Sequence, residues 1–254
     1  TDTGKWRKVF AASRSLKDGG LPHREWRLSA QGMAENLLTF LRLLKKPGHG
    51  SDKFSIRPEG KIRIIIHGSG FIGLTSAEVL LDREKDIRVC GISDEAAAVY
   101  NPQGIDIQSL AEWKQKGKTI DDYPLSAGAI RLSPQELIRQ EADILLTASV
   151  AELVNSGNFQ ELKVMVIFEA ADISVEEKII ARLQENGILY IPGLVANGAG
   201  AYAAFEEDLH SQAAEIKDWG FLKSHVESKI LGNARFLAWV FFKLFSLLVR
   251  DFFS

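Results

Sequence analysis

The chain has 254 residues, and its 31 lysines and arginines nearly balance 33 aspartates and glutamates, leaving a formal charge of −2. Hydrophobic residues make up 46% of the chain and charged residues 25%, which is typical of a folded globular protein and excludes a disordered or fibrous one. The single cysteine, Cys90, excludes an internal disulfide framework and a cysteine-rich zinc site, and favours a reducing compartment such as the cytoplasm or an organelle matrix.

The beginning of the chain carries an excess of positive charge. Through residue 65 there are 14 basic and 6 acidic residues, a net of +8, so the remaining 17 basic and 27 acidic residues give −10. Because the aromatic residues of this segment show no regular interleaving that would suggest base stacking, we expect it to face an acidic surface of another domain or subunit rather than nucleic acid. Residues 1–28 lack sustained periodicity and contain Gly19-Gly20, which indicates a basic leader or an interdomain remnant.

A helix is predicted directly after this leader. Ser29 is a suitable N-cap, and the helix should end near Lys45, before Pro47. Apolar residues recur at helical spacing at Met33, Leu37, Leu38, Leu41 and Leu44. This spacing predicts an amphipathic helix at the start of a central domain, residues 29–210.

Short apolar runs and helical patterns then alternate. Strands are expected at 62–66, 87–92, 144–147, 164–168 and 188–191. Helices are expected at 74–81, 106–116, 133–139 and 175–184. Such alternation predicts an α/β fold, a doubly wound and mostly parallel sheet with helices on both faces.

The end of the chain, residues 211–254, should consist of helices and an apolar tail. Residues 199–232 are polar enough for a surface or interface helix, whereas 236–249 are nearly all apolar. The tail is shorter than the roughly 20 residues that cross a bilayer of about 30 Å, so no membrane span is expected. A helix buried against a partner is favoured; an interfacial membrane helix and a tail foreign to the fold are the alternatives.

A glycine-rich turn joins the first expected strand to the helix after it. It consists of Gly68-Ser69-Gly70-Phe71-Ile72-Gly73 and fits the G-x-G-x-x-G pattern of Rossmann-like dinucleotide-binding domains. The first glycine allows the tight turn, the second lets the backbone approach a pyrophosphate, and the third permits close packing of helix and strand. The helix N-terminus offers N–H groups to the phosphates. A tight turn that binds nothing is the alternative.

An acidic residue follows the second expected strand, as the same fingerprint requires about 20 residues on. Asp94 stands there; its carboxylate can accept the adenosine ribose hydroxyls and repels a 2′-phosphate. Residues 95–98 contain no lysine or arginine to bind such a phosphate, so NAD is favoured over NADP. Glu95 could supply the acid instead, and Asp94 would then be an ordinary loop residue.

Other reactive side chains form no recognisable catalytic or metal-binding pattern. His67 directly precedes the glycines and is more often structural than catalytic at such a position, and Cys90 lies inside an expected buried strand. Sequences of the types G-x-S-x-G, H-E-x-x-H and Walker A do not occur, so hydrolase and phosphoryl-transfer functions are unsupported.

Several motifs together resemble the coenzyme domain of the glutamate, leucine, phenylalanine and valine dehydrogenase family, most of all glutamate dehydrogenase. The most specific is Y-N-P-Q-G-I-D at 100–106, which follows the ribose acid. Others are A-D-I-L-L-T-A-S at 142–149, E-A-A-D at 169–172 and I-P-G-L-V-A-N at 191–197. Thr3-Gly4-Lys5, Gly19-Gly20 and Ser29-Ala30-Gln31-Gly32 resemble a diverged T-G-K, G-G and T-G-R-G series, so the resemblance covers roughly residues 1–210.

The resemblance implies NAD-dependent oxidative deamination of an L-amino acid, with glutamate the expected substrate, to a 2-oxo acid and ammonia. In such enzymes a separate N-terminal domain carries the catalytic lysine and aspartate, so we expect the isolated chain to be inactive without that domain or a partner chain. Homo-oligomers in the cytoplasm or mitochondrial matrix are also expected. The alternative is a non-catalytic, regulatory or degenerate NAD-binding module.

Departures from the family pattern bear on that alternative. Gln31 replaces the family's arginine, Asp172 replaces an asparagine near the nicotinamide ribose, and Ala204 stands where glutamate-specific members carry a serine. Ser29 keeps the hydroxyl of a cofactor-contacting threonine. The predicted cofactor-binding residues are Gly68, Ser69, Gly70, Phe71, Ile72, Gly73, Asp94, Ala148, Ser149, Asp172, Asn197 and Ser29.

Overall fold

The computed structural model describes residues 21–44, 60–211 and 219–252, with side chains except at 206–211, 219 and 244–252. Most of the predicted leader, including Thr3-Gly4-Lys5 and Gly19-Gly20, therefore lies outside the described residues. In the described part of the chain, seven strands form one sheet in the order β4-β3-β2-β1-β5-β6-β7. They are β1 (Ile62–His67), β2 (Ile87–Ser93), β3 (Ala98–Tyr100), β4 (Ile130–Leu132), β5 (Ile144–Thr147), β6 (Val166–Glu169) and β7 (Leu189–Ile191).

Five of these strands run parallel, from β2 through β1, β5 and β6 to β7. Strands β3 and β4 add an antiparallel edge beyond β2. The chain moves outward from β1 in one direction to β2 and in the other to β5, which makes the carboxyl ends of β1 and β5 a topological switch point. The predicted α/β fold with a mostly parallel sheet is confirmed.

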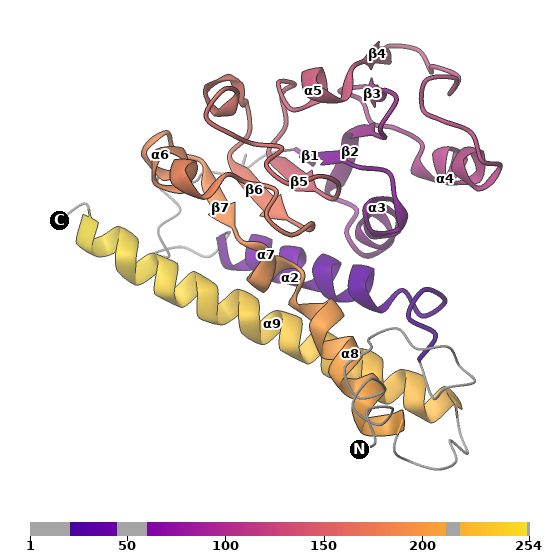
Figure 1. Ribbon diagram of the computed structural model, residues 1–254, viewed down its shortest axis with the longest axis vertical. Helices are drawn as coiled ribbons and strands as arrows, with labels where there is room; N and C mark the ends of the chain where they lie inside the picture. Colours follow the sequence, from indigo (N-terminus) through magenta and orange to yellow (C-terminus); the bar gives the residue numbers. More distant parts are fainter. Residues whose placement is uncertain (1–20, 45–59, 212–218, 253–254) are drawn as a thin grey trace, which may run out of the picture.

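Helices cover both faces of the sheet (Figure 1). They are α2 (Leu28–Leu44), α3 (Phe71–Arg83), α4 (Ile107–Gln115), α5 (Pro134–Leu137), α6 (Ile180–Glu185), α7 (Gly193–Ala196), α8 (Gly198–Ser211) and α9 (Trp219–Phe252), with 3₁₀ turns η2 (Phe159–Glu161) and η3 (Glu177–Ile179). Side chains alternate between two cores, as the pleat requires. In β1, Ile64 and Ile66 pack in the core that includes α2 and α3, whereas Ile65 packs in the core of α5 and α6.

Helix α2 is buried nearly all round, although its sequence predicts an amphipathic helix. Figure 1 shows the reason: α2 lies between the sheet and α9, so the face away from the sheet is covered as well. At Gly32 an added Cβ would lie 2.0 Å from the Ala199 Cβ, so α2 and α8 approach too closely for a side chain there. The helix begins at Leu28, so Ser29 is in its first turn rather than at the predicted N-cap.

Helix α9 joins the later part of the expected polar segment, from Trp219, to the apolar tail in one helix, whereas the earlier part of that segment forms the separate helix α8. It packs on α2 through a row of buried residues that includes Ala234, Ala238 and Phe242. The Phe242 ring meets Phe40 of α2 edge-on, with ring centroids 6.0 Å apart. In the described part of the tail, α2 of the same chain thus covers the face that carries Ala238 and Phe242, whereas Phe236 and Trp239 on the other side are 60% and 48% exposed. Among the described residues, no helix is both long and apolar enough to cross a membrane.

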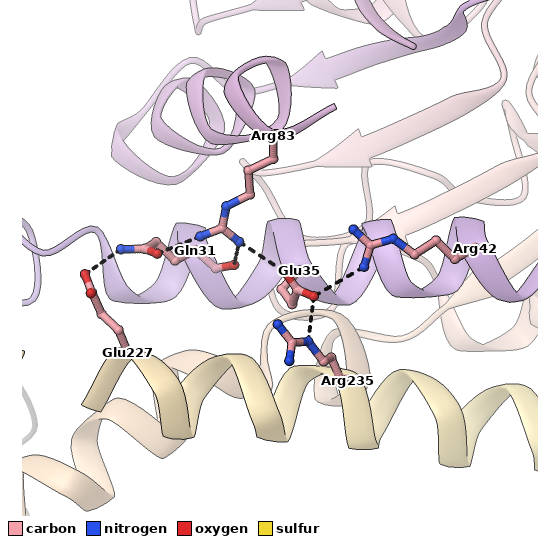
Figure 2. A network of polar contacts seen from close by, with 6 residues as sticks. All are labelled: Gln31, Glu35, Arg42, Arg83, Glu227 and Arg235. Carbon is pink, nitrogen blue, oxygen red and sulfur yellow. Dashed lines mark hydrogen bonds and ion pairs between the residues drawn. The ribbon is translucent and has the colours of Figure 1, made fainter. Parts of the chain in front are cut away.

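A polar network fastens α9 to α2 and α3 (Figure 2). The buried Glu35 carboxylate accepts from Arg235 of α9 at 2.8 Å, from Arg83 of α3 at 3.2 Å and from Arg42 at 3.4 Å. Gln31 donates to Glu227 of α9 at 2.8 Å and accepts from Arg83 at 2.7 Å. Gln31, which stands where the resemblance implies an arginine, thus belongs to this network. We call the group the Glu35 network.

Candidate functional site

The glycine turn lies at the carboxyl end of β1, at the switch point between β1 and β5. Gly68 has φ +110°, a backbone conformation that favours glycine. A Cβ on Gly73 would lie 1.8 Å from the Gly68 carbonyl oxygen, whereas a Cβ on Gly70 would meet no atom within 4 Å. The three glycines therefore have three separate geometries: a turn, an open approach and a tight packing contact. These match the geometries that a dinucleotide-binding turn requires.

Helix α3 begins directly after this turn, and no side chain caps its N-terminus. Gly70 occupies the N-cap position and makes no side-chain hydrogen bond, so the first N–H groups of the helix remain available to an anion. Ser69 is 4% exposed, and its buried Oγ has no hydrogen-bond partner in the described part of the chain. Phe71 and Ile72, the first two residues of α3, are both half-buried beside the turn.

Asp94 lies at the end of β2, as predicted, but its carboxylate is already surrounded by donors. Oδ1 accepts from the N–H groups of Ala96 and Ala97, each at 3.0 Å. Oδ2 accepts from Lys114 at 2.6 Å and from the Ile120 N–H at 2.8 Å. Four donors fill the roughly four acceptor positions of a carboxylate. Asp94 therefore holds its own loop to α4, and the exposed neighbour is Glu95.

The pKa of Asp94 reflects the same contacts. Burial opposes ionisation, but the hydrogen bonds from Lys114 and from the backbone N–H groups of Ile120, Ala97 and Ala96 outweigh it and hold the pKa below its ordinary value. The carboxylate is thus a stable anion whose charge is balanced by Lys114. That balance removes much of the repulsion that Asp94 was predicted to exert on a 2′-phosphate.

Two polar residues meet where β1 and β5 end side by side. The Ser149 Oγ lies 2.5 Å from His67 Nδ1, and the Ala148 N–H donates to the His67 carbonyl at 2.8 Å. Burial lowers the His67 pKa to about 4, with the backbone of Pro134 acting in the opposite direction. The imidazole is therefore neutral at pH 7. Ser149 itself is exposed at the edge of the sheet, so this pair links the turn to the predicted nicotinamide end.

Glu169, at the end of β6, holds together the loops that follow β6 and β7. Its Oε1 accepts from the N–H and Oγ of Ser174 and from the Val175 N–H, at 2.6, 3.0 and 3.3 Å. Its Oε2 accepts from Tyr190 Oη and the Gly193 N–H, each at 2.6 Å. Burial, then the contact with Glu169, raises the pKa of the Tyr190 hydroxyl. Asp172, by contrast, is exposed in the loop between these contacts.

The loops after β5 and β6 are also bonded to each other. The Glu152 N–H donates to the Ile173 carbonyl at 2.7 Å, and both residues have positive φ, +50° and +57°. A β-branched residue with positive φ is a rare, strained conformation that tends to occur at functional sites. Ile173 is 68% exposed, so the strained residue lies beside Asp172 on the surface of the predicted nicotinamide end.

Ser29 and Asn197, distant in sequence, come together at the start of α8. A Cβ on Gly200 would lie 3.4 Å from the Ser29 Oγ and 3.9 Å from the Asn197 Oδ1. The Asn197 Oδ1 is buried and has no hydrogen-bond partner among the described residues. An orphaned amide oxygen of this kind costs free energy unless a ligand or water donates to it, which suits the predicted position near the nicotinamide.

The structure thus gathers the predicted residues along one edge of the sheet, and it adds three that were not predicted to act there. His67 and Glu169 are the last residues of β1 and β6, the strands on either side of β5. Lys114 directly follows Trp113 near the end of α4 and pairs with Asp94, a contact for which the local sequence gives no signal. Cys90 is buried in β2, and burial raises its thiol pKa to about 11. The cysteine is therefore a core residue, as predicted.

Comparison with known proteins identifies the family. The sequence profile of the family "Glutamate/Leucine/Phenylalanine/Valine dehydrogenase" matches residues 51–219, more than half of the chain. The chain belongs to this family. It is 29% identical over 167 residues to glutamate dehydrogenase of Thermotoga maritima, a match that covers 65% of this chain and 39% of that protein. The chain therefore spans well under half the length of this relative.

Solved structures agree in fold. Plasmodium falciparum glutamate dehydrogenase superposes with a TM-score of 0.69 at 19% identity, covering 89% of this chain and 46% of that chain. The hetero-hexameric glutamate dehydrogenase of Thermus thermophilus, solved in a leucine-bound form, gives 0.68 at 20% identity, with 89% and 49% covered. L-tryptophan dehydrogenase of Nostoc punctiforme gives 0.53 at 16% identity, with 84% and 52% covered.

Proposed function

We propose that this chain is the NAD-binding part of an amino-acid dehydrogenase, which oxidatively deaminates an L-amino acid when the catalytic groups of an N-terminal domain are supplied. The observation that carries the proposal is the glycine turn, whose three glycines have the turn, the open approach and the close contact of a dinucleotide site. The uncapped α3 N-terminus and the orphaned Ser69 hydroxyl fit a pyrophosphate.

The residues at the sheet edge fit the remaining parts of the cofactor. Ala148 and Ser149 would lie against the nicotinamide half, and the orphaned Asn197 amide oxygen would accept a hydrogen bond from it. Ser29 and Asp172 would face the same half of the site. When bound, the nicotinamide supplies the hydride acceptor, while the chain's own residues bind and orient it.

For the adenosine ribose we propose Glu95 as the acid, with Asp94 holding the loop in place. Asp94 has four donors and a balancing lysine, whereas the Glu95 carboxylate is exposed at the same strand end. An exposed, unbalanced carboxylate accepts ribose hydroxyls and repels a 2′-phosphate, which supports NAD over NADP.

Fluorescence titration with NADH tests the proposal directly. We expect saturable binding of NADH, weaker binding of NADPH, and a smaller difference between the two in Glu95→Gln. Asp121→Asn, an exposed acid after α4, is the charge-matched control and should keep the wild-type preference. Failure of the wild-type chain to bind either cofactor would refute the assignment.

The alternative, a non-catalytic NAD-binding module, draws on Asp172. Its exposed carboxylate puts a negative charge where the family pattern has a neutral asparagine. NADH formation by the native protein that contains this chain, measured over a panel of L-amino acids including glutamate, leucine, phenylalanine and valine, distinguishes the two. Turnover supports the dehydrogenase, and tight NADH binding without any turnover supports the module.

The partners and the compartment remain part of this proposal. We propose an amino acid as the small-molecule substrate, further copies of the chain as oligomeric partners, and no nucleic acid. The unreactive, buried Cys90 is consistent with a reducing compartment such as the cytoplasm or the mitochondrial matrix.

A further inference from the structure

An arginine from the segment before α2 lies against the glycine turn. The Arg24 guanidinium carbon is 4.9 Å from the centroid of the Phe71 ring. Phe71 is the fourth residue of the turn motif and the first residue of α3. Arg24 is exposed and, among the described residues, has no ion-pair partner. The stack therefore holds an uncompensated positive charge beside the N-terminus of α3.

The segment around Arg24 is fixed to the body of the domain. The Trp26 N–H donates to the Pro22 carbonyl at 2.9 Å, and the Leu28 N–H donates to the His23 carbonyl at 3.1 Å. Leu21 and Leu28 are buried in a core with residues of α8 and α9. The position of Arg24 next to the turn is thus set by packing on both sides of it.

A second arginine of the same segment provides a contrast. Arg27 pairs with Glu78 of α3 at 3.1 Å, so its charge is neutralised within the chain. The two arginines therefore differ in their partners, although only three residues separate them. Arg27 is paired with a carboxylate, whereas Arg24 contacts an aromatic ring and keeps its charge.

A dinucleotide needs positive charge at this place. Its pyrophosphate carries two negative charges, yet residues 67–73 contain no lysine or arginine, and the sheet edge presents the exposed acids Glu95 and Asp172. Backbone N–H groups alone supply only partial charges. An arginine adds a full charge and two parallel donors that match phosphate oxygens.

We propose that Arg24 is a further cofactor-binding residue, which stacks on Phe71 and donates to the pyrophosphate. This inference rests on the proposed function, because it assumes a dinucleotide in the glycine turn. It also gives Phe71 a role that the motif does not specify: the ring aligns the guanidinium beside the turn.

Binding measurements with a ladder of ligands test this assignment. Adenosine, ADP and NADH share the adenosine group, but only ADP and NADH carry the pyrophosphate. By calorimetry and NADH fluorescence, Arg24→Gln should weaken ADP and NADH binding by about tenfold to a hundredfold, the usual range for a charged hydrogen bond. Adenosine affinity should not change, and the ADP affinity of Arg24→Gln should depend less on salt concentration.

Two further variants separate this role from a structural one. Arg27→Gln removes the same charge from the same segment and should leave the ADP affinity at the wild-type value. Phe71→Leu keeps Arg24 but removes the ring, and should give an intermediate loss for ADP. Thermal unfolding of each variant checks that the fold is retained.

The outcomes are distinct. Equal ADP affinity in Arg24→Gln and the wild type overturns the assignment, as does an equal loss for ADP and adenosine, which would indicate a distorted site. If the wild-type chain binds none of the three ligands, the proposed function itself fails. A selective loss for ADP and NADH in Arg24→Gln, absent in Arg27→Gln, supports the assignment.

Discussion

Gly70 and Gly73 belong to the same turn, yet a methyl group on each would have different consequences. We expect Gly73→Ala to destabilise the fold by about 1–3 kcal/mol, the range for overpacking, because its Cβ would lie 1.8 Å from the Gly68 carbonyl oxygen. Gly70→Ala should keep the wild-type stability, because no atom lies within 4 Å of its Cβ, but should weaken NADH binding by about tenfold or more. Urea unfolding and NADH titration measure the two effects.

An equal loss of stability in both variants would mean that there is no free space for a side chain at Gly70. If Gly70→Ala bound NADH as tightly as the wild type, the pyrophosphate would not lie at this turn.

The lowered pKa of the Asp94 carboxyl should make the stability of the fold depend on pH. Because its folded pKa is below the unfolded value of about 3.9, its contribution is fully present above pH 4–5 and is lost as the pH falls through the folded pKa. We expect Asp94→Asn to lower the free energy of unfolding by about 2–3 kcal/mol at pH 7, and this difference to shrink at about pH 3. Urea unfolding at both pH values measures it; a difference independent of pH would contradict the ionised pair with Lys114.

For single residues, the sequence predicts which side chains lie at the carboxyl ends of the strands, but it does not predict their hydrogen-bond partners. The spacing of Gly68, Gly70 and Gly73 is enough to predict the turn, the open approach and the close contact, because these three features depend only on the local chain geometry. The ion pair of Asp94 with Lys114, 20 residues further along the chain, depends on how α4 packs against the sheet. No local sequence pattern predicts that packing. The pairing of His67 with Ser149 depends in the same way on β1 and β5 being neighbours.

The attachment of α9 depends on one buried carboxylate. The Glu35 side chain is 7% exposed and contacts three guanidinium groups, whereas Arg235 is 58% exposed. We expect Glu35→Gln to lower the free energy of unfolding by about 3–5 kcal/mol, as when a buried ion pair loses one partner. Arg235→Gln should cost less than about 1 kcal/mol, because exposed pairs contribute little. Chemical denaturation of both variants and of the double variant gives the coupling between them.

A loss in Arg235→Gln as large as that in Glu35→Gln would mean that the network has one dominant pair instead of a shared carboxylate.

Among the elements, those with strong local patterns were predicted well and those that depend on tertiary packing were not. The expected strand at 144–147 and the helix at 106–116 agree with β5 and α4 to within a residue. The antiparallel edge strands β3 and β4 were not predicted, because three residues each carry too little periodicity. The expected helix at 175–184 begins later, with the 3₁₀ turn η3 before α6, because the backbone at Val175 is bonded to Glu169 instead.

For the whole molecule, cofactor binding should appear as thermal stabilisation. A ligand present at 100 times its Kd adds about 2.7 kcal/mol to the stability of the state that binds it, which corresponds to a rise of about 5–10 °C in Tm for a domain of this size. We expect this rise with NADH and a smaller one with NADPH at the same concentration. Thermal unfolding monitored by circular dichroism measures both. Gly70→Ala should lose about half of the rise or more, because tenfold weaker binding lowers the stabilisation to about 1.4 kcal/mol.

The contact of α2 with α9 can form only late in synthesis, after the strands of the sheet have been made. Glu35 and Arg235 are 200 residues apart in sequence, so α2 leaves the ribosome long before the helix that covers it exists. The sheet from β1 to β7 can form in the interval, because its strands pair over shorter stretches of chain. We expect pulsed hydrogen exchange during refolding to protect β1 and β5 before α2. Until α9 is made, the apolar outer face of α2, including Phe40, has no helix to cover it and stays exposed to solvent.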